Sequence, residues 1–315
     1  VFAGSSLEPI DCAVLRSDVT EAPGICDNVR SRDGRGVLVR AGPEGAHEEI
    51  TPADTDVRTL VHEYGGGDIA VQNGVVYYAD FEDQRLYRTN GTGEPTAITT
   101  PPETDRGLRY ADMDVSPDGE TIYAVRERHE GDGAAEEPVT ELVRLPTDGS
   151  DEPSVVADGH DFYAAPRLSP DGTQLAWLGW DHPQMPWDGT ELHLAPRAED
   201  GTLGDDEVIM GGPDESVFQP GWSPSGVLHA VSDRTGWWNL YALGASGAAE
   251  PTNRTPEEAE FGVPQWAFGL STYAFLEDGR VAILRNKDGQ SSLCLLDGTE
   301  LTEAALPFDA YPRAK

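Results

Sequence analysis

The residues best suited to chemistry lie in the stretch GHDFYAAPRLSPDGTQLAW, which covers residues 159–177. His160, Asp161, Ser169 and Asp171 fall here within a dozen residues, and serine, histidine and aspartate are the members of a serine-hydrolase triad. Neighbouring residues of a strand point to opposite faces, so the adjacency of His160 and Asp161 is poor evidence that they pair. The recurrence of this stretch along the chain decides how it is interpreted.

The serine of this stretch has counterparts elsewhere. Ser116, Ser169 and Ser223 are 53 and 54 residues apart, and the first two begin the tetrapeptide SPDG. A type I β-turn prefers serine in the first place, proline in the second and glycine in the fourth. Because a hydrolase nucleophile would not recur in three copies, we predict that these serines are turn residues.

The remaining motifs supply no catalytic or metal-binding set. HEYGG at His62 begins like the zinc motif HExxH, but Gly66 stands where the second histidine is needed. No GK[ST] follows the glycines at 65–67, so we interpret them as residues that permit a tight backbone at a strand start. No GxSxG nucleophile motif occurs. We therefore expect no catalytic residue, no metal and no cofactor in this chain.

Repetition along the chain predicts the elements that carry these residues. Short alternating segments, each followed by a glycine-containing turn, recur at intervals of 48, 56, 50, 48 and 53 residues, marked by leucines 38, 86, 142, 192, 240 and 293. In the clearest unit we predict strands at 110–115, 121–127, 141–146 and 153–158. Units of four strands about 50 residues apart, without long amphipathic helices, predict an all-β fold, a β-propeller of four-stranded antiparallel blades.

We expect a single propeller domain over residues 1–315. A degenerate or partial first blade covers 1–50, and the other units fall at about 51–100, 101–155, 156–212, 213–255 and 256–303. About six blades are thus visible. An incomplete ring would expose edge strands, and oligomers could then form through them.

Composition narrows the function classes. The net charge of −35 is spread along the chain, which argues against a nucleic-acid partner, since phosphate binding needs basic patches. The 25 aromatic residues favour folding over disorder, so we interpret the acidic, lysine-poor composition as halophilic adaptation. No apolar run is long enough to span a membrane, and no signal peptide is evident. We expect a cytoplasmic protein without membrane contact.

The two faces of the predicted disc differ. Turns between first and second strands and between third and fourth strands are short, whereas the loops on the other face are long and rich in Trp, Tyr, His and Arg. Exposed aromatic residues with arginine are typical of binding surfaces, so we predict that this second face meets a substrate or partner. In the alternative interpretation, Trp180, Trp187, Trp237 and Trp238 pack between blades.

Several long segments resemble one family. VHEYGGGD, GHDFYAAPRLSPDG, WDHPQMPWDGTEL, GGPDESVFQPGWSP and SDRTGWWNLY are similar to the N-terminal propeller of the prolyl-oligopeptidase family of serine peptidases, of the acylaminoacyl-peptidase or dipeptidyl-aminopeptidase type. The similarity runs from about Val37 to about Leu296. It implies seven blades, and a catalytic α/β-hydrolase domain in the same protein that these 315 residues do not contain.

The resemblance implies a function for the chain. The propeller would gate the access of small peptides to the hydrolase active site and help to position them, so that the hydrolase domain and peptide substrates are its partners. The residues expected to face the hydrolase or its cavity are Arg126, Arg128, Tyr163, Arg167, Trp180, Asp181, His182, Trp187, Arg234, Trp237 and Trp238. One alternative is a stand-alone TolB-like propeller that acts as an interaction scaffold. A propeller enzyme such as a glycosidase is another, but no convincing acid pair supports it.

Overall fold

Strands are the regular secondary structure of the part of the chain that the structure describes. A computed structural model describes residues 25–32, 34–41, 47–129, 137–244 and 250–304, and these contain six antiparallel sheets, one of three strands and five of four. In this part of the chain no helix is long and apolar enough to cross a membrane. The all-β propeller predicted from the repeats is confirmed.

Each sheet consists of consecutive strands paired in chain order. The first holds β1 (Ile25–Arg32), β2 (Arg35–Ala41) and β3 (His47–Glu49), and the second β4 (Ile69–Gln72), β5 (Val75–Ala79), β6 (Leu86–Thr89) and β7 (Thr96–Ala97). The third holds β8 (Leu108–Val115), β9 (Thr121–Arg128), β10 (Val139–Pro146) and β11 (Ser154–Ala157), and the fourth β12 (Phe162–Leu168), β13 (Gln174–Trp180), β14 (Thr190–Pro196) and β15 (Glu207–Gly212). The fifth holds β16 (Val217–Trp222), β17 (Leu228–Ser232), β18 (Asn239–Ala242) and β19 (Thr252–Asn253), and the sixth β20 (Tyr273–Phe275), β21 (Val281–Lys287), β22 (Gln290–Asp297) and β23 (Glu300–Glu303).

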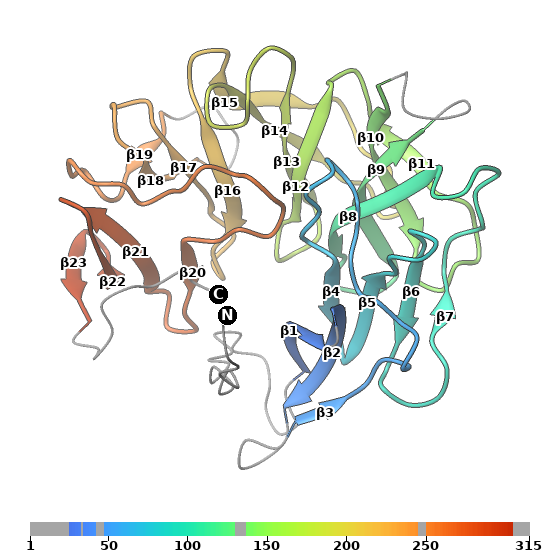
Figure 1. Ribbon diagram of the computed structural model, residues 1–315. Coiled ribbons are helices and arrows are strands. Elements are labelled where there is room, and N and C mark those ends of the chain that lie inside the picture. Colours follow the sequence, from blue (N-terminus) through green and yellow to red (C-terminus); the bar gives the residue numbers. More distant parts are fainter. Residues whose placement is uncertain (1–24, 33, 42–46, 130–136, 245–249, 305–315) are drawn as a thin grey trace, which may run out of the picture.

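The sheets follow one another around an arc, in chain order from blue to red (Figure 1). The first strands of neighbouring sheets contact each other, as β4 does with β8, β8 with β12 and β12 with β16, so these strands line the inside of the arc. A sheet with a neighbour on each side, such as the third, then has both faces covered. For this reason Tyr110, Ile122 and Leu142 of the third sheet are all buried.

The repeated serines build turns, as predicted. Ser169 Oγ donates a hydrogen bond to Asp171 Oδ1 at 2.6 Å and accepts one from the backbone N–H of Gln174 at 3.0 Å. The N–H of Gly172 closes the turn on the carbonyl oxygen of Ser169 at 2.8 Å. Ser116 accepts the equivalent bond from Thr121 N–H at 2.9 Å. These buried hydroxyls are fully used by the turn between β12 and β13 and its counterpart between β8 and β9.

The inner strands share a β-bulge that locks neighbouring sheets together. Asp112, Ala165 and Gln219 occupy equivalent places in β8, β12 and β16, and all have positive φ, at 50°, 52° and 49°. The bulge turns a side chain or an N–H group toward the neighbouring sheet. As a result, Ala165 N–H donates a hydrogen bond to Asp112 Oδ2 at 2.7 Å, and Thr272 N–H donates one to Gln219 Oε1 at 2.7 Å.

The glycine run at 65–67 lies just before β4 and has positive φ at all three residues, in keeping with the tight backbone predicted there, and it also permits a close approach of another segment. Gly65 accepts a hydrogen bond from Phe268 N–H at 3.0 Å, and Gly66 forms an isolated parallel bridge with Phe268. A Cβ on Gly66 would lie 2.4 Å from the Phe268 carbonyl oxygen. The connector before β4 is thereby tied to the long connector between β19 and β20.

Candidate functional site

Loops between second and third strands, and connectors between sheets, lie at the same end of each antiparallel sheet. We call this end of the propeller the loop face. Among the described residues, the well-exposed large side chains on it include Tyr64 at 72%, Met185 at 44%, Trp237 at 39% and Trp266 at 57%. Exposed aromatic residues that gather on one face are typical of interaction surfaces.

Two tryptophans of the loop face meet across a large sequence distance. The rings of Trp187, in the loop after β13, and Trp266, in the connector before β20, have centroids 4.3 Å apart. The connector of Trp266 is bound to the connector of Tyr64 through Gly65 and Phe268. Tyr64, Trp187 and Trp266 therefore belong to segments that contact one another.

The predicted tryptophans divide between the core and the surface. Trp180 is buried and stacks on Phe162 with centroids 5.4 Å apart, while Trp238 is half-buried and packs against the hydrophobic cluster of the fifth and sixth sheets. Trp187 is half-buried and Trp237 is exposed. Packing between blades thus accounts for Trp180 and Trp238, and leaves Trp187 and Trp237 accessible to a partner.

The predicted arginines of the third and fifth sheets are engaged by carboxylates. Arg126 donates to Glu141 Oε2 through Nη2 at 2.6 Å, and Arg128 donates to Glu141 Oε1 at 3.2 Å. Glu141 is 7% exposed, so one buried carboxylate holds two guanidinium groups on the loop face. Arg234 binds Glu215 through Nε at 3.0 Å and Nη2 at 3.3 Å.

Arg167 and Tyr163 lie in β12, one of the strands that line the inside of the arc. Arg167 Nη2 donates to Asp112 Oδ1 at 2.9 Å, which places the guanidinium at the bulge between β8 and β12. Tyr163 is buried, and its hydroxyl accepts a hydrogen bond from His160 N–H at 3.1 Å. Tyr163 therefore anchors the connector that carries His160.

Sequence reasoning did not single out Glu127, a buried carboxylate of the loop face. Burial raises the pKa of Glu127, against the opposing effect of hydrogen bonds from the His62 N–H at 2.7 Å and His129 Nε2 at 3.1 Å. Arg109 Nη1 lies 3.8 Å from Glu127 Oε2, the oxygen that His129 also contacts. Glu127 thus joins the connector of His62 to the end of β9, and no short motif marks it.

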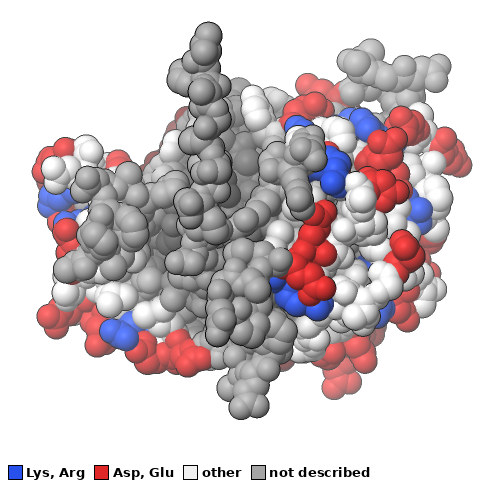
Figure 2. All heavy atoms as spheres, turned by 60° about the horizontal axis from the view of Figure 1, so that its bottom comes forward, with Lys and Arg blue, Asp and Glu red and all other residues white. Residues whose placement is uncertain are grey.

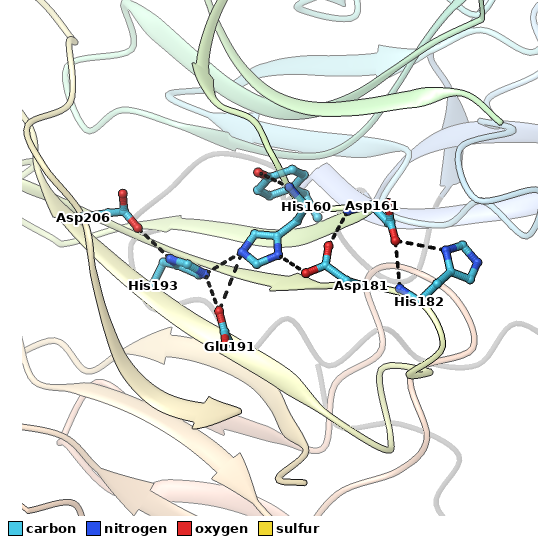
Figure 3. Close-up of polar contacts among 8 residues, drawn as sticks. His160, Asp161, Asp181, His182, Glu191, His193 and Asp206 are labelled. Atoms are coloured by element: carbon cyan, nitrogen blue, oxygen red, sulfur yellow. Dashed lines mark hydrogen bonds and ion pairs between the residues drawn. The ribbon is translucent and has the colours of Figure 1, made fainter. Parts of the chain in front are cut away.

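The histidine and aspartate pairs before β12 and after β13 are crossed (Figure 3). His160 Nδ1 binds Asp181 Oδ2 at 3.0 Å, whereas Asp161 Oδ2 binds His182 Nδ1 at 3.1 Å and His182 N–H at 2.8 Å. The His182 N–H and imidazole lower the pKa of the Asp161 carboxyl. The adjacent His160 and Asp161 lie in the connector before β12, and their side chains bind different partners rather than each other.

His160 also meets residues of β14 that sequence reasoning missed. Its Nε2 lies 3.2 Å from His193 Nε2 and 3.8 Å from Glu191 Oε2, and His193 Nδ1 binds Asp206 Oδ2 at 2.6 Å (Figure 3). His160, Glu191 and His193 are the group of described side chains that could hold a metal ion. Glu191 and His193 are two residues apart in β14, so their side chains lie on the same face of the strand. This spacing is the only sequence signal for the cluster.

Acidic side chains are spread around the molecule. Figure 2 shows Asp and Glu along several parts of the rim, with Lys and Arg few and interspersed among them. The view contains no broad basic area on the residues it describes, in keeping with the net charge of −35.

Comparison with solved structures shows what this chain is similar to. A structure of puromycin hydrolase matches 96% of this chain with 36% identity and a TM-score of 0.82, and a puromycin-hydrolysing peptidase from Mycobacterium tuberculosis matches 88% with 37% identity and a TM-score of 0.79. The chain spans less than half of those proteins, 49% and 44% of their lengths. No protein-family model and no curated protein matches the chain.

A more distant likeness extends to a different kind of propeller protein. A structure described as TolB from Agrobacterium tumefaciens matches 82% of this chain at 14% identity with a TM-score of 0.51. At that identity the likeness concerns the fold alone. The puromycin-hydrolysing peptidases differ, because more than a third of the aligned residues are the same along nearly all of this chain.

Proposed function

This chain belongs to the propeller domains of the prolyl-oligopeptidase family of serine peptidases, and from this premise we propose that it controls access to a hydrolase active site. In this proposal the hydrolase domain lies in the same protein and small peptides are the substrates. The single observation that carries it is the identity to puromycin-hydrolysing peptidases along nearly all of this chain but only half of theirs.

The loop face is the surface we assign to the hydrolase domain and to the substrate. Trp187, Trp237 and Trp266 offer aromatic area there, which stable interfaces between domains use. Arg126 and Arg128 both bind Glu141, so two guanidinium groups lie close together on this face. Guanidinium groups can bind the carboxylate end of a small peptide through two parallel hydrogen bonds.

Gating follows from the placement of such a propeller. If it covers the active site, only substrates small enough to pass between the two domains reach the nucleophile. The rate constant kcat/KM should then fall steeply with peptide length. Substrate positioning by loop-face residues adds to binding without taking part in bond breaking, because the chain has no GxSxG motif.

The experiment starts from the native protein of the source, captured with an antibody against this chain. We expect an intact mass near twice 33.9 kDa, together with hydrolysis of puromycin and of short aminoacyl amides. The purified chain of 315 residues, assayed in parallel, should hydrolyse neither. A native mass near 33.9 kDa without peptidase activity would reject the proposal and favour a scaffold role.

A further inference from the structure

We propose that His160, Glu191 and His193 form a binding site for a divalent transition-metal ion, with Zn²⁺ as the best fit. The three ligand atoms come from two segments, His160 from the connector before β12 and the other two from β14. The proposal rests on the geometry of this cluster and is independent of the peptidase proposal.

The distances between the ligand atoms match one shared ion. His160 Nε2 and His193 Nε2 lie 3.2 Å apart, and Glu191 Oε2 lies 3.8 Å from the first and 3.7 Å from the second. A point at equal distance from the corners of this triangle is about 2.1 Å from each, which is the length of Zn–N and Zn–O bonds. Two imidazoles and a carboxylate favour zinc over Mg²⁺ or Ca²⁺, which prefer oxygen ligands.

The hydrogen bonds of the two imidazoles fix the atoms that face the site. His160 Nδ1 binds Asp181 Oδ2 at 3.0 Å and His193 Nδ1 binds Asp206 Oδ2 at 2.6 Å. A carboxylate only accepts hydrogen bonds, so each Nδ1 carries a proton, and in the neutral imidazole each Nε2 then presents a lone pair. Two lone pairs and a carboxylate oxygen therefore converge, and a cation between them removes their repulsion. Carboxylates behind the imidazoles are the usual support of metal-binding histidines.

The surrounding residues hold this arrangement and leave one side open. Trp177 stacks on His193 with centroids 5.4 Å apart and planes 3° from parallel. Gly179 makes room for His160, because a Cβ there would lie 2.6 Å from the imidazole. The side chain of His193 is 8% exposed and that of Glu191 36%, so an ion can enter from solvent and keep a water as fourth ligand.

The local charge also favours a cation. Among the described residues no lysine or arginine forms an ion pair with Asp181, Glu191 or Asp206. The ligands and their supporting aspartates come from every strand of the fourth sheet or from residues next to it. His160 precedes β12, Asp181 follows β13, the other two ligands lie in β14, and Asp206 precedes β15. A bound ion would therefore stabilise the end of this sheet that carries the loop of Trp187.

The test is calorimetric titration of the chelator-treated chain of 315 residues with ZnCl₂. We expect one ion per chain and a raised melting temperature. Glu191→Gln, a change of one atom at a partly exposed position, should lower the affinity at least about 100-fold, and Asp206→Asn about 10- to 100-fold with unchanged stoichiometry. The matched control is His182→Ala. It removes an exposed histidine next to Asp181, in the loop after β13, and should bind zinc like the unaltered chain.

Co²⁺ substitution supplies a second readout that does not depend on stability. A tetrahedral cobalt absorption band should appear with the unaltered chain and with His182→Ala, and vanish in Glu191→Gln. Absence of binding at about 1 mM ZnCl₂ would overturn the proposal and leave a shared proton between the imidazoles. Binding that survives unchanged in Glu191→Gln and Asp206→Asn would overturn it as well.

Discussion

His62 is a buried histidine of the connector before β4, and its imidazole is enclosed by aromatic rings. Phe162, Trp180 and Phe268 lie with ring centroids 5.2, 5.7 and 4.7 Å from it. Its Nε2 has no hydrogen-bond partner. Burial lowers the pKa of His62 from 6.5 to about 4, although the nearby charge of Asp112 acts to raise it.

This pKa shift predicts a loss of stability in mild acid. The unfolded chain takes up a proton at His62 below pH 6.5, whereas the folded chain does so only near pH 4, so stability that is present above 6.5 is lost as the pH falls. Between about pH 7 and pH 5 the loss from His62 should be about 2 kcal/mol. His62→Phe removes the titrating group, so its denaturant unfolding should lose about 2 kcal/mol less over this range than the unaltered chain. Equal losses in both proteins would contradict the assignment.

Connectors, rather than strands, join distant parts of the propeller. Residues 61–68 belong to the connector before β4, and residues 254–272 form the connector before β20. The two segments are far apart in the sequence, yet Gly66 pairs with Phe268. Gly66 has a φ of +89°, and its hydrogen atoms face the Phe268 backbone. Only a residue without a side chain fits both conditions.

Gly66→Ala should therefore destabilise the propeller strongly. The substitution adds a steric collision, worth about 1–3 kcal/mol, to the cost of a left-handed conformation, about 1–2 kcal/mol. Gly74→Ala is the matched control, because Gly74 has a φ of +77° but no atom within 4 Å of the added Cβ. We expect the free energy of unfolding to fall clearly more for Gly66→Ala than for Gly74→Ala. Equal effects would mean that the contact with Phe268 does not constrain the fold.

At the scale of the whole molecule, the main feature is the large excess of acidic residues. The chain carries 57 acidic and 22 basic residues, and acidic side chains lie along several parts of the face seen in Figure 2. Repulsion among so many like charges opposes the compact state at low ionic strength. Salt shortens the range of this repulsion, from about 10 Å at 0.1 M to about 3 Å at 1 M.

Stability should consequently rise with salt. We expect the melting temperature to increase between about 0.1 M and 2 M KCl, measured by circular dichroism. Sucrose at equal osmolality is the control, because it favours the folded state without screening charge. A melting temperature that does not depend on KCl would reject the halophilic interpretation of the composition.

Much of the fold could be predicted from the sequence because its signals are local. Alternation in segments such as 121–127 and the SPDG turn at Ser169 depend on neighbouring residues only. The structure confirms the turns and the four-stranded sheets. The exposed aromatic residues of the loop face could be predicted only in part, since Trp180 and Trp187 belong to the same segment but lie in different environments.

The sequence by itself determined the repeat, the strands, the turn serines and the acidic surface, because each depends on residue type and short spacing. Only the tertiary structure decided which side chains meet. His160 lies beside Glu191 and His193 because β12, β13 and β14 pair side by side, with Gly179 beneath the imidazole. Gly66 meets Phe268 because the connector before β4 and the connector before β20 lie side by side. Such contacts depend on strand register and on the closure of the blades, and no short segment of the chain contains either.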